Sequence, residues 1–153
     1  MVHERGIEIS QKTIAAINKV VALEMKVELQ SLIGKINFIR RFISNLSKKI
    51  QSFSSLLKLK ADQDFLWGEE HQKALDEIKH YLVNPPVLVP PQKHKPFKLY
   101  LSADEHAIGS ALIQEFEGKE RVIYFVSRRL LDAETRYSPV ERLSLLIFFL
   151  YQA

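Results

Sequence analysis

The most distinctive chemistry in the sequence is a run of basic residues that contains no acid. No Asp or Glu occurs between Leu29 and Ala61, and outside this window 15 basic residues stand against 18 acidic ones, so the remainder of the chain is net −3. A concentrated positive field favours a polyanion such as nucleic acid as partner. A solvated helix face whose acids lie elsewhere is the alternative, and charge alone does not separate the two. The window holds seven basic side chains: Lys35, Arg40, Arg41, Lys48, Lys49, Lys58 and Lys60.

Other kinds of site have little support in the sequence. The chain has no Cys, which excludes a disulfide framework, a thiolate zinc site and a cysteine nucleophile. Glycine-rich phosphate loops and Gly-x-Ser-x-Gly nucleophile elbows are absent as well. The histidines show no metal-ligand pairing, so we expect them to be solvated or to pack, and we expect no bound metal; they are His3, His71, His80, His94 and His106.

The composition is that of a globular chain. Its 153 residues are 46% hydrophobic and 26% charged, enough to bury a core in one domain or two small ones. No apolar run reaches the roughly 18 to 20 residues of a membrane span, and the N-terminus lacks a signal peptide. We therefore expect a cytoplasmic or nuclear location and no membrane partner.

The elements that would carry the basic residues are predicted to be helices. Apolar residues recur at spacings of three and four from Val27 to Leu46, which predicts one helix. Short helices are predicted after Ser10 and Ser47, and an amphipathic helix over 69–83. Residues 86–96 are predicted to form a proline-rich linker.

On the long helix, Phe38, Arg41 and Phe42 fall outside the apolar arc and could meet a nucleic-acid duplex. Lys35, Arg41 and Lys48 would contact phosphates without regard to sequence, and Lys49 belongs to the same surface. The alternative is that the two Phe rings pack on a neighbouring domain. Arg40 lies inside the arc, which neither interpretation explains.

After the linker the apolar period changes from 3.6 to 2. Alternation over 97–102 predicts a strand, and 108–114 and 122–126 predict a hairpin that turns at Gly118. Ser138, Pro139 and Glu141 form a helix-start signature before an apolar C-terminal helix.

Three strings carry a resemblance to a known family: LQSLIGKINFIRRFI (29–43), LYLSADEHAIGSALIQ (99–114) and YFVSRRLLDAETRY (124–137). In this order they resemble the reverse transcriptase polyprotein of gypsy-type LTR retrotransposons, and the opening phrase Val2–Glu8 resembles plant members. The resemblance implies an α+β chain: a helical thumb-like unit followed by a truncated RNase H-like mixed sheet of three strands with flanking helices. Residues 1–60 would be the palm–thumb junction and thumb, 61–96 a connecting helix and linker, and 97–153 the N-terminal part of the RNase H-like domain.

The resemblance also implies partners and a catalytic site. The partners would be RNA–DNA hybrid or duplex DNA, bound without sequence preference, and the remaining parts of the polyprotein. Active members cut hybrid RNA with magnesium held by carboxylates. Here Ser102 and Leu143 occupy the two ligand positions that fall within the chain, so we expect no catalytic residue and no cofactor. Asp104 with Glu141 as displaced ligands is a minor alternative.

Two functions stay open. The first is a nucleic-acid-gripping and connecting fragment that is inactive alone, with an uncovered sheet edge and helix face. The second is a piece of an active RNA-directed DNA polymerase and ribonuclease H whose catalytic residues lie in flanking sequence.

Overall fold

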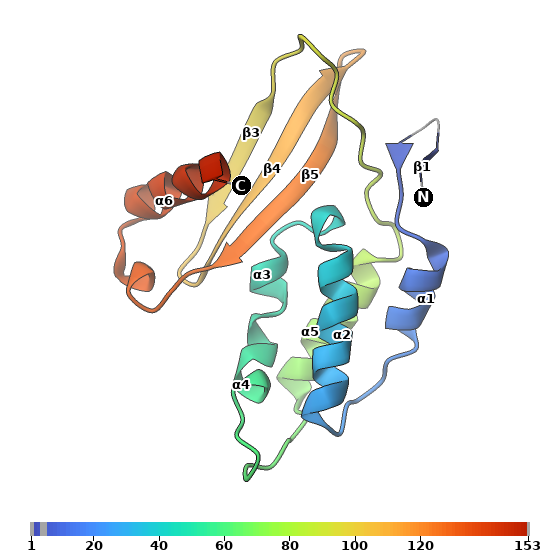
Figure 1. The fold of residues 1–153 in the computed structure, drawn as a ribbon, viewed down its shortest axis with the longest axis vertical. Coiled ribbons are helices and arrows are strands. Elements are labelled where there is room, and N and C mark those ends of the chain that lie inside the picture. The colour runs from blue at the N-terminus through green and yellow to red at the C-terminus, as the bar shows by residue number, and fades with distance from the viewer. Residues whose placement is uncertain (1, 4–5, 153) are drawn as a thin grey trace.

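The computed structural model describes residues 2–3 and 6–152. A helical unit forms one half of the elongated molecule, and a three-stranded sheet with one covering helix forms the other (Figure 1). Two positions of the phrase Val2–Glu8, 4 and 5, lie outside the described residues, and so does the side chain of His3. The predicted α+β class is confirmed.

The helical unit contains short helices around two longer ones. Apolar side chains from α2 and α5 form much of its core, and α1, the short helices after α2 and the linker add others. Leu29 and Ile36 of α2 and Leu75 and Ile78 of α5 are completely or almost completely buried there. The elements are β1 (Val2–His3), β2 (Gly6–Ile7), α1 (Gln11–Asn18), α2 (Lys26–Phe38), η1 (Arg40–Phe42), α3 (Leu46–Lys49), η2 (Gln51–Phe53), α4 (Ser54–Leu57) and α5 (Glu69–Tyr81).

The predicted single helix from Val27 to Leu46 is wrong. Helix α2 ends at Phe38, a 3-10 turn follows, and Asn45 adopts a left-handed conformation with φ 49° before α3 begins. Ile39 and Ile43 are nevertheless buried, as is Phe42. In a 3-10 turn residues three apart, such as Ile39 and Phe42, lie on one side, so the apolar spacing continues past the end of α2. Spacing alone therefore could not separate one helix from two.

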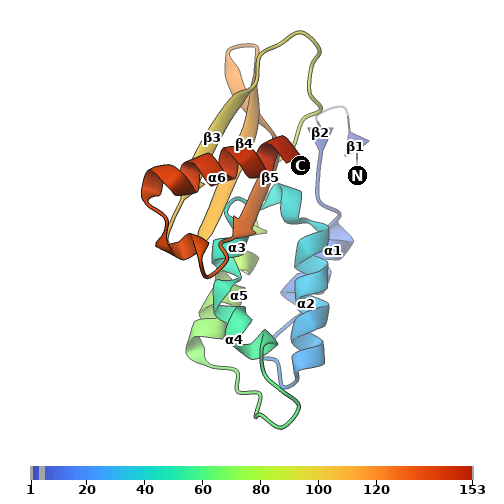
Figure 2. The same cartoon turned by 60° about the vertical axis from the view of Figure 1, so that its left-hand side comes forward.

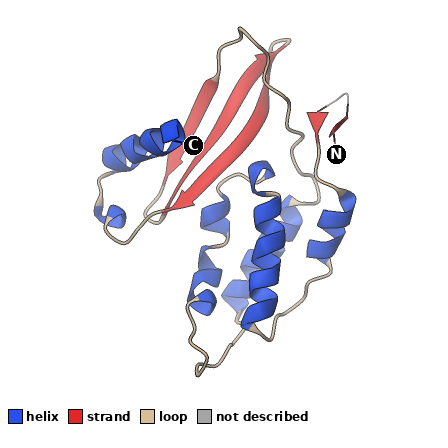
Figure 3. Ribbon diagram, in the orientation of Figure 1, coloured by secondary structure: helices blue, strands red, loops and turns tan. Residues whose placement is uncertain are grey.

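The sheet consists of β3 (Lys98–Ala103), β4 (Ala107–Phe116) and β5 (Lys119–Arg129), in that spatial order and antiparallel throughout (Figure 3). The predicted hairpin between β4 and β5 is confirmed. Its turn places Glu117 at φ 51° and Gly118 at φ 76°, the left-handed pair that a tight hairpin needs.

Helix α6 (Pro139–Gln152) crosses one face of the sheet (Figure 2), after the short turn η3 (Glu134–Arg136). The predicted helix start is confirmed: the backbone N–H of Ser138 donates to Glu141 Oε2 at 2.7 Å, and the N–H of Glu141 donates to Ser138 Oγ at 3.4 Å. Leu146 is fully buried against Ile108 of β4, whereas Tyr151 is 90% exposed. Part of the apolar face of α6 is thus uncovered, as expected.

A proline-rich linker connects α5 to β3, and hydrogen bonds from the side chain of Gln114 hold it in place. Gln114 is fully buried. Its Oε1 accepts the N–H of Gln92 at 2.8 Å, and its Nε2 donates to the carbonyls of Gln92 and Lys95 at 3.1 and 3.0 Å. Among the residues that the structure describes, no helix is long and apolar enough to cross a membrane.

Candidate nucleic-acid interface

The outward face of α2 carries two of the predicted binding residues. Lys35 is exposed, and the Phe38 ring is 80% exposed. Gly34 lies beside them in the middle of the helix, and a Cβ placed there would meet no atom within 4 Å. This face is therefore open, and Phe38 does not pack on the sheet.

The next predicted residue, Arg41, lies in the 3-10 turn η1 and is exposed together with Arg40. Arg40 fell inside the predicted apolar arc only because the prediction extended one helix past Phe38, where α2 ends. With the helix ended there, the structure turns its side chain to solvent. Neither guanidinium makes an ion pair with a described residue.

The prediction that the Phe42 ring meets a nucleic-acid duplex is wrong. Its ring is only 6% exposed and belongs to the helical core, so it cannot meet a duplex. Its carbonyl accepts a hydrogen bond from the Tyr81 hydroxyl at 2.8 Å, which ties η1 to α5. Neither alternative for the Phe rings holds for Phe42, because its ring packs inside the helical core of this chain and not on a neighbouring domain.

Lys49 also faces inward. Its Nζ donates to the Ser44 carbonyl at 2.7 Å and lies 5.3 Å from the centroid of the Tyr81 ring. Burial lowers the pKa of this ammonium. Lys49 stabilises the turn before α3 in this structure and does not present its charge on the α2 face.

Lys48 is exposed but paired. Its Nζ lies 2.8 Å from Asp104 Oδ2, in the turn after β3. The hydrogen bond to Asp104 raises the pKa of Lys48. Partial burial by itself would raise the pKa of Asp104, but hydrogen bonds from Lys48 and from the amides of His106 and Ala107 hold it below its ordinary value.

Two further contacts join the helical unit to the sheet near this ion pair. The backbone N–H and the hydroxyl of Ser47 reach Ser127 Oγ at 3.0 and 3.2 Å, so Ser47 is not the helix cap that the sequence predicts. The cap position belongs to Asn45, whose side chain lies against Gly109 of β4. Together these contacts set how the α2 face lies relative to the sheet.

The two positions at which the resemblance implies metal ligands, Ser102 and Leu143, lie on different sides of the sheet. Ser102 pairs with Gly109, and Gly109 pairs with Ser127, which places all three on the face that meets the helical unit. Helix α6, which carries Leu143, packs on the opposite face through Ile108. The structure therefore does not bring Ser102 and Leu143 together on one face.

The chain's residues do not fit a magnesium site at these positions. A hydroxyl and an isobutyl group cannot replace carboxylate ligands. Asp104 does not continue β3 beside Ser102, because its Oδ1 accepts the amides of His106 and Ala107 in a turn. Glu141 caps α6. No group of three His, Asp or Glu side chains that could hold a metal occurs among the residues described.

Sequence reasoning missed Gly34 and the pairing of Asp104 with Lys48. A glycine inside a helical period weakens the helix, and Gly34 is such a residue between Leu32 and Ile36. The sequence therefore contained a local signal that marks Gly34 as unusual. The partnership of Asp104 with Lys48 joins residues 56 positions apart, and no local pattern indicates it.

Comparison with known proteins identifies the family. Residues 67–153 match the family model described as the RNase H-like domain found in reverse transcriptase, and the chain belongs to this family. It is similar to the Pol polyproteins of retroviruses and retrotransposons, so the predicted relation to retroelement polyproteins is confirmed at that level.

Two relatives illustrate the range. The Gag-Pol polyprotein of walleye dermal sarcoma virus is 30% identical over 112 residues, which are 73% of this chain and 6% of that protein. The Retrovirus-related Pol polyprotein from transposon opus of Drosophila melanogaster is 27% identical and covers 94% of this chain. The chain spans 15% of the opus protein's length.

Solved structures share the fold. The foamy viral protease-reverse transcriptase in complex with dsDNA superposes with a TM-score of 0.84 over 98% of this chain and 31% of that chain, at 23% identity. The same viral protein in complex with RNA/DNA hybrid gives a TM-score of 0.82 at 23% identity, over 98% of this chain and 20% of that chain.

Proposed function

We propose that this chain grips a nucleic-acid duplex through the outward face of α2 and the turn η1, and connects that grip to an RNase H-like sheet. The observation that carries the proposal is the exposed, unpaired set Lys35, Phe38 and Arg41 in a stretch without acidic residues. Lys48 joins this set when it is released from Asp104. Phosphate contacts of this kind bind duplex DNA or RNA–DNA hybrid without sequence preference.

The fold likeness to reverse transcriptases solved with dsDNA and with RNA/DNA hybrid supports these two partners. In this proposal, residues 1–60 act as palm–thumb junction and thumb, 61–96 as connecting helix and linker, and 97–153 as the first part of the RNase H-like domain. The source would be a gypsy-type retrotransposon, which the three strings resemble, and a plant-like one, which the phrase Val2–Glu8 resembles. The other parts of the polyprotein would be partners.

We propose further that the chain is catalytically inactive by itself. Ser102 and Leu143 supply no carboxylate at the family's ligand positions, and Asp104 and Glu141 are engaged in a turn and a helix cap. Hydrolysis of the RNA strand through two metal ions would need those carboxylates. The purified chain should therefore leave hybrid RNA intact in magnesium or manganese. Metal-dependent cleavage that is lost in Asp104→Ala would refute the inactive assignment.

The binding half of the proposal is tested by salt dependence. Affinity of the full chain for a labelled 20-bp DNA duplex should fall with salt, and each phosphate contact adds about −0.9 to the log–log slope. Lys35→Gln and Arg41→Gln should each flatten the slope by about 0.9, and Phe38→Ala should weaken binding with little change in slope. Lys93→Gln, an exposed lysine in the linker, is the matched control.

If Lys35→Gln, Arg41→Gln and Lys93→Gln have equal effects, affinity depends on the net charge of the chain alone. The α2 face would then not be the duplex-binding surface. A hybrid of the same length should give a similar ranking of variants, since the contacts are to phosphates.

A further inference from the structure

In the ion pair between Lys48 and Asp104, the carboxylate is held in place by other hydrogen bonds and the ammonium is exposed. Asp104 is fixed from within the sheet half, because its Oδ1 accepts the His106 amide at 2.8 Å and the Ala107 amide at 3.0 Å. Its other oxygen lies 2.8 Å from Lys48 Nζ. The turn therefore holds one carboxylate oxygen in front of a lysine that belongs to the helical unit.

The Lys48 end of the pair is open to solvent. Its side chain is 63% exposed, against 33% for Asp104. An ammonium has three donors, and Asp104 is the only acidic side chain within 4.0 Å of it among the described residues. Exposed pairs of this kind are weak, so another anion can replace the carboxylate.

We infer that Asp104 competes with nucleic-acid phosphate for the Lys48 ammonium. The carboxylate of the sheet half then lowers the affinity of the helical unit for a duplex, and a bound duplex in turn releases the ion pair. The two effects are equal in size because linkage is reciprocal. This inference rests on the proposed function and adds an internal regulator of its binding surface.

The neighbouring residue provides a matched control. Glu105 is exposed in the same turn and makes no ion pair with a described residue. Asp104→Asn and Glu105→Gln each remove one negative charge at nearly the same place. Asp104→Asn also retains an oxygen that can accept the amides of His106 and Ala107, so the turn can persist.

The experiment measures affinity of the full chain for a 20-bp DNA duplex between 50 and 300 mM KCl. Asp104→Asn should raise affinity about two- to fivefold beyond Glu105→Gln at low salt. Its log–log slope should change by much less than the roughly 0.9 of one phosphate contact, because Lys48 reaches a phosphate in the bound state of both chains. In a Lys48→Gln background the two variants should become equivalent.

A second measurement uses the unaltered chain and does not depend on how a variant folds. The pKa of Asp104, read from its carboxyl carbon shift, should rise when the chain is saturated with duplex, and more than the pKa of Glu105 does. Equal rises, or equal affinities of Asp104→Asn and Glu105→Gln while Arg41→Gln still weakens binding, overturn the competition alone. Absence of salt-dependent binding in the unaltered chain overturns the proposed function and the competition together.

Discussion

The side chain of Asn45 lies directly against Gly109, and it fills the space that a side chain at position 109 would need. A Cβ on Gly109 would stand 2.2 Å from Asn45 Oδ1 and 3.3 Å from its Cγ. Gly109 is buried in the middle strand, and Asn45 ends the turn before α3. The helical unit and the sheet can approach this closely only because one of the two positions carries no side chain.

Gly109→Ala should therefore loosen the junction. The new methyl group must displace the Asn45 side chain, and overpacking of this type costs about 1–3 kcal/mol. Urea unfolding should show the loss as a lower midpoint at unchanged slope. Asn45→Gly in the same chain removes the obstructing side chain and suits the left-handed φ at that position. The double variant should regain most of the lost stability, and a loss that persists in it would place the strain elsewhere.

Gly34→Ala should have opposite effects on stability and on binding. The Cβ meets no atom within 4 Å, so the helix gains about 0.5–1 kcal/mol from the better helix former. The same methyl group would stand on the α2 face where a duplex approaches, so affinity for DNA should fall. Unfolding and binding measured on the same preparation check this prediction. A more stable variant with unchanged affinity would show that the duplex does not come close to Gly34.

Gln114→Met should free the linker. The substitution keeps the side-chain length but removes the three hydrogen bonds to the backbone of Gln92 and Lys95, at a cost of about 0.5–1.5 kcal/mol for each bond. Amide exchange at Gln92 should accelerate because its hydrogen bond is gone. Gln30→Met, on the exposed side of α2, should change neither stability nor exchange at Gln92.

The sequence predicted the class of the fold because both halves show strong periodicity. The change from spacings of three and four to alternation marks the passage from helices to strands, and Gly118 marks the hairpin turn. It did not predict the end of α2 at Phe38. Ile39 and Ile43 already depart from helical geometry, and an isoleucine is no signal for a helix end. The interruption brings η1 and α3 against β5, which is a tertiary effect.

The candidate site was only partly predictable for a related reason. A helical wheel drawn through residue 46 correctly placed Lys35 and Phe38 outside the core, because α2 is helical there. It misplaced Phe42, which lies beyond the end of α2 and turns into the core. The inward turn of Lys49 towards Tyr81 and the pairing of Lys48 with Asp104 depend on distant segments, which no local pattern contains.

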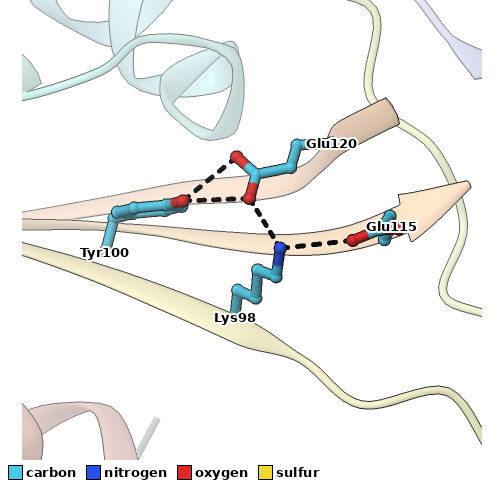
Figure 4. Close-up of polar contacts among 4 residues, drawn as sticks. All are labelled: Lys98, Tyr100, Glu115 and Glu120. Atoms are coloured by element: carbon cyan, nitrogen blue, oxygen red, sulfur yellow. Dashed lines mark hydrogen bonds and ion pairs between the residues drawn. The ribbon is translucent and has the colours of Figure 1, made fainter. Parts of the chain in front are cut away.

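A polar cluster at the hairpin end of the sheet gives a prediction about pH (Figure 4). Glu115 and Glu120 pair directly across β4 and β5, and Lys98 from β3 reaches both, at 3.3 and 2.9 Å. The Tyr100 hydroxyl donates to Glu120 at 3.0 Å. Hydrogen bonds from Lys98 and then Tyr100 lower the pKa of Glu120.

Lys98→Gln should therefore raise the pKa of Glu120, since two facing carboxylates lose the cation between them. A carboxyl whose pKa is lowered by folding stabilises the fold above its ordinary value of 4.5 and loses that contribution as pH falls through the lowered value. The unaltered chain should thus lose this contribution on acidification below pH 4.5, and the variant should have little of it to lose. Carboxyl NMR titration of Glu120 measures the shift directly. Lys119→Gln removes a neighbouring exposed charge without touching the cluster, and an equal rise of the Glu120 pKa in that variant would assign the effect to general charge and not to Lys98.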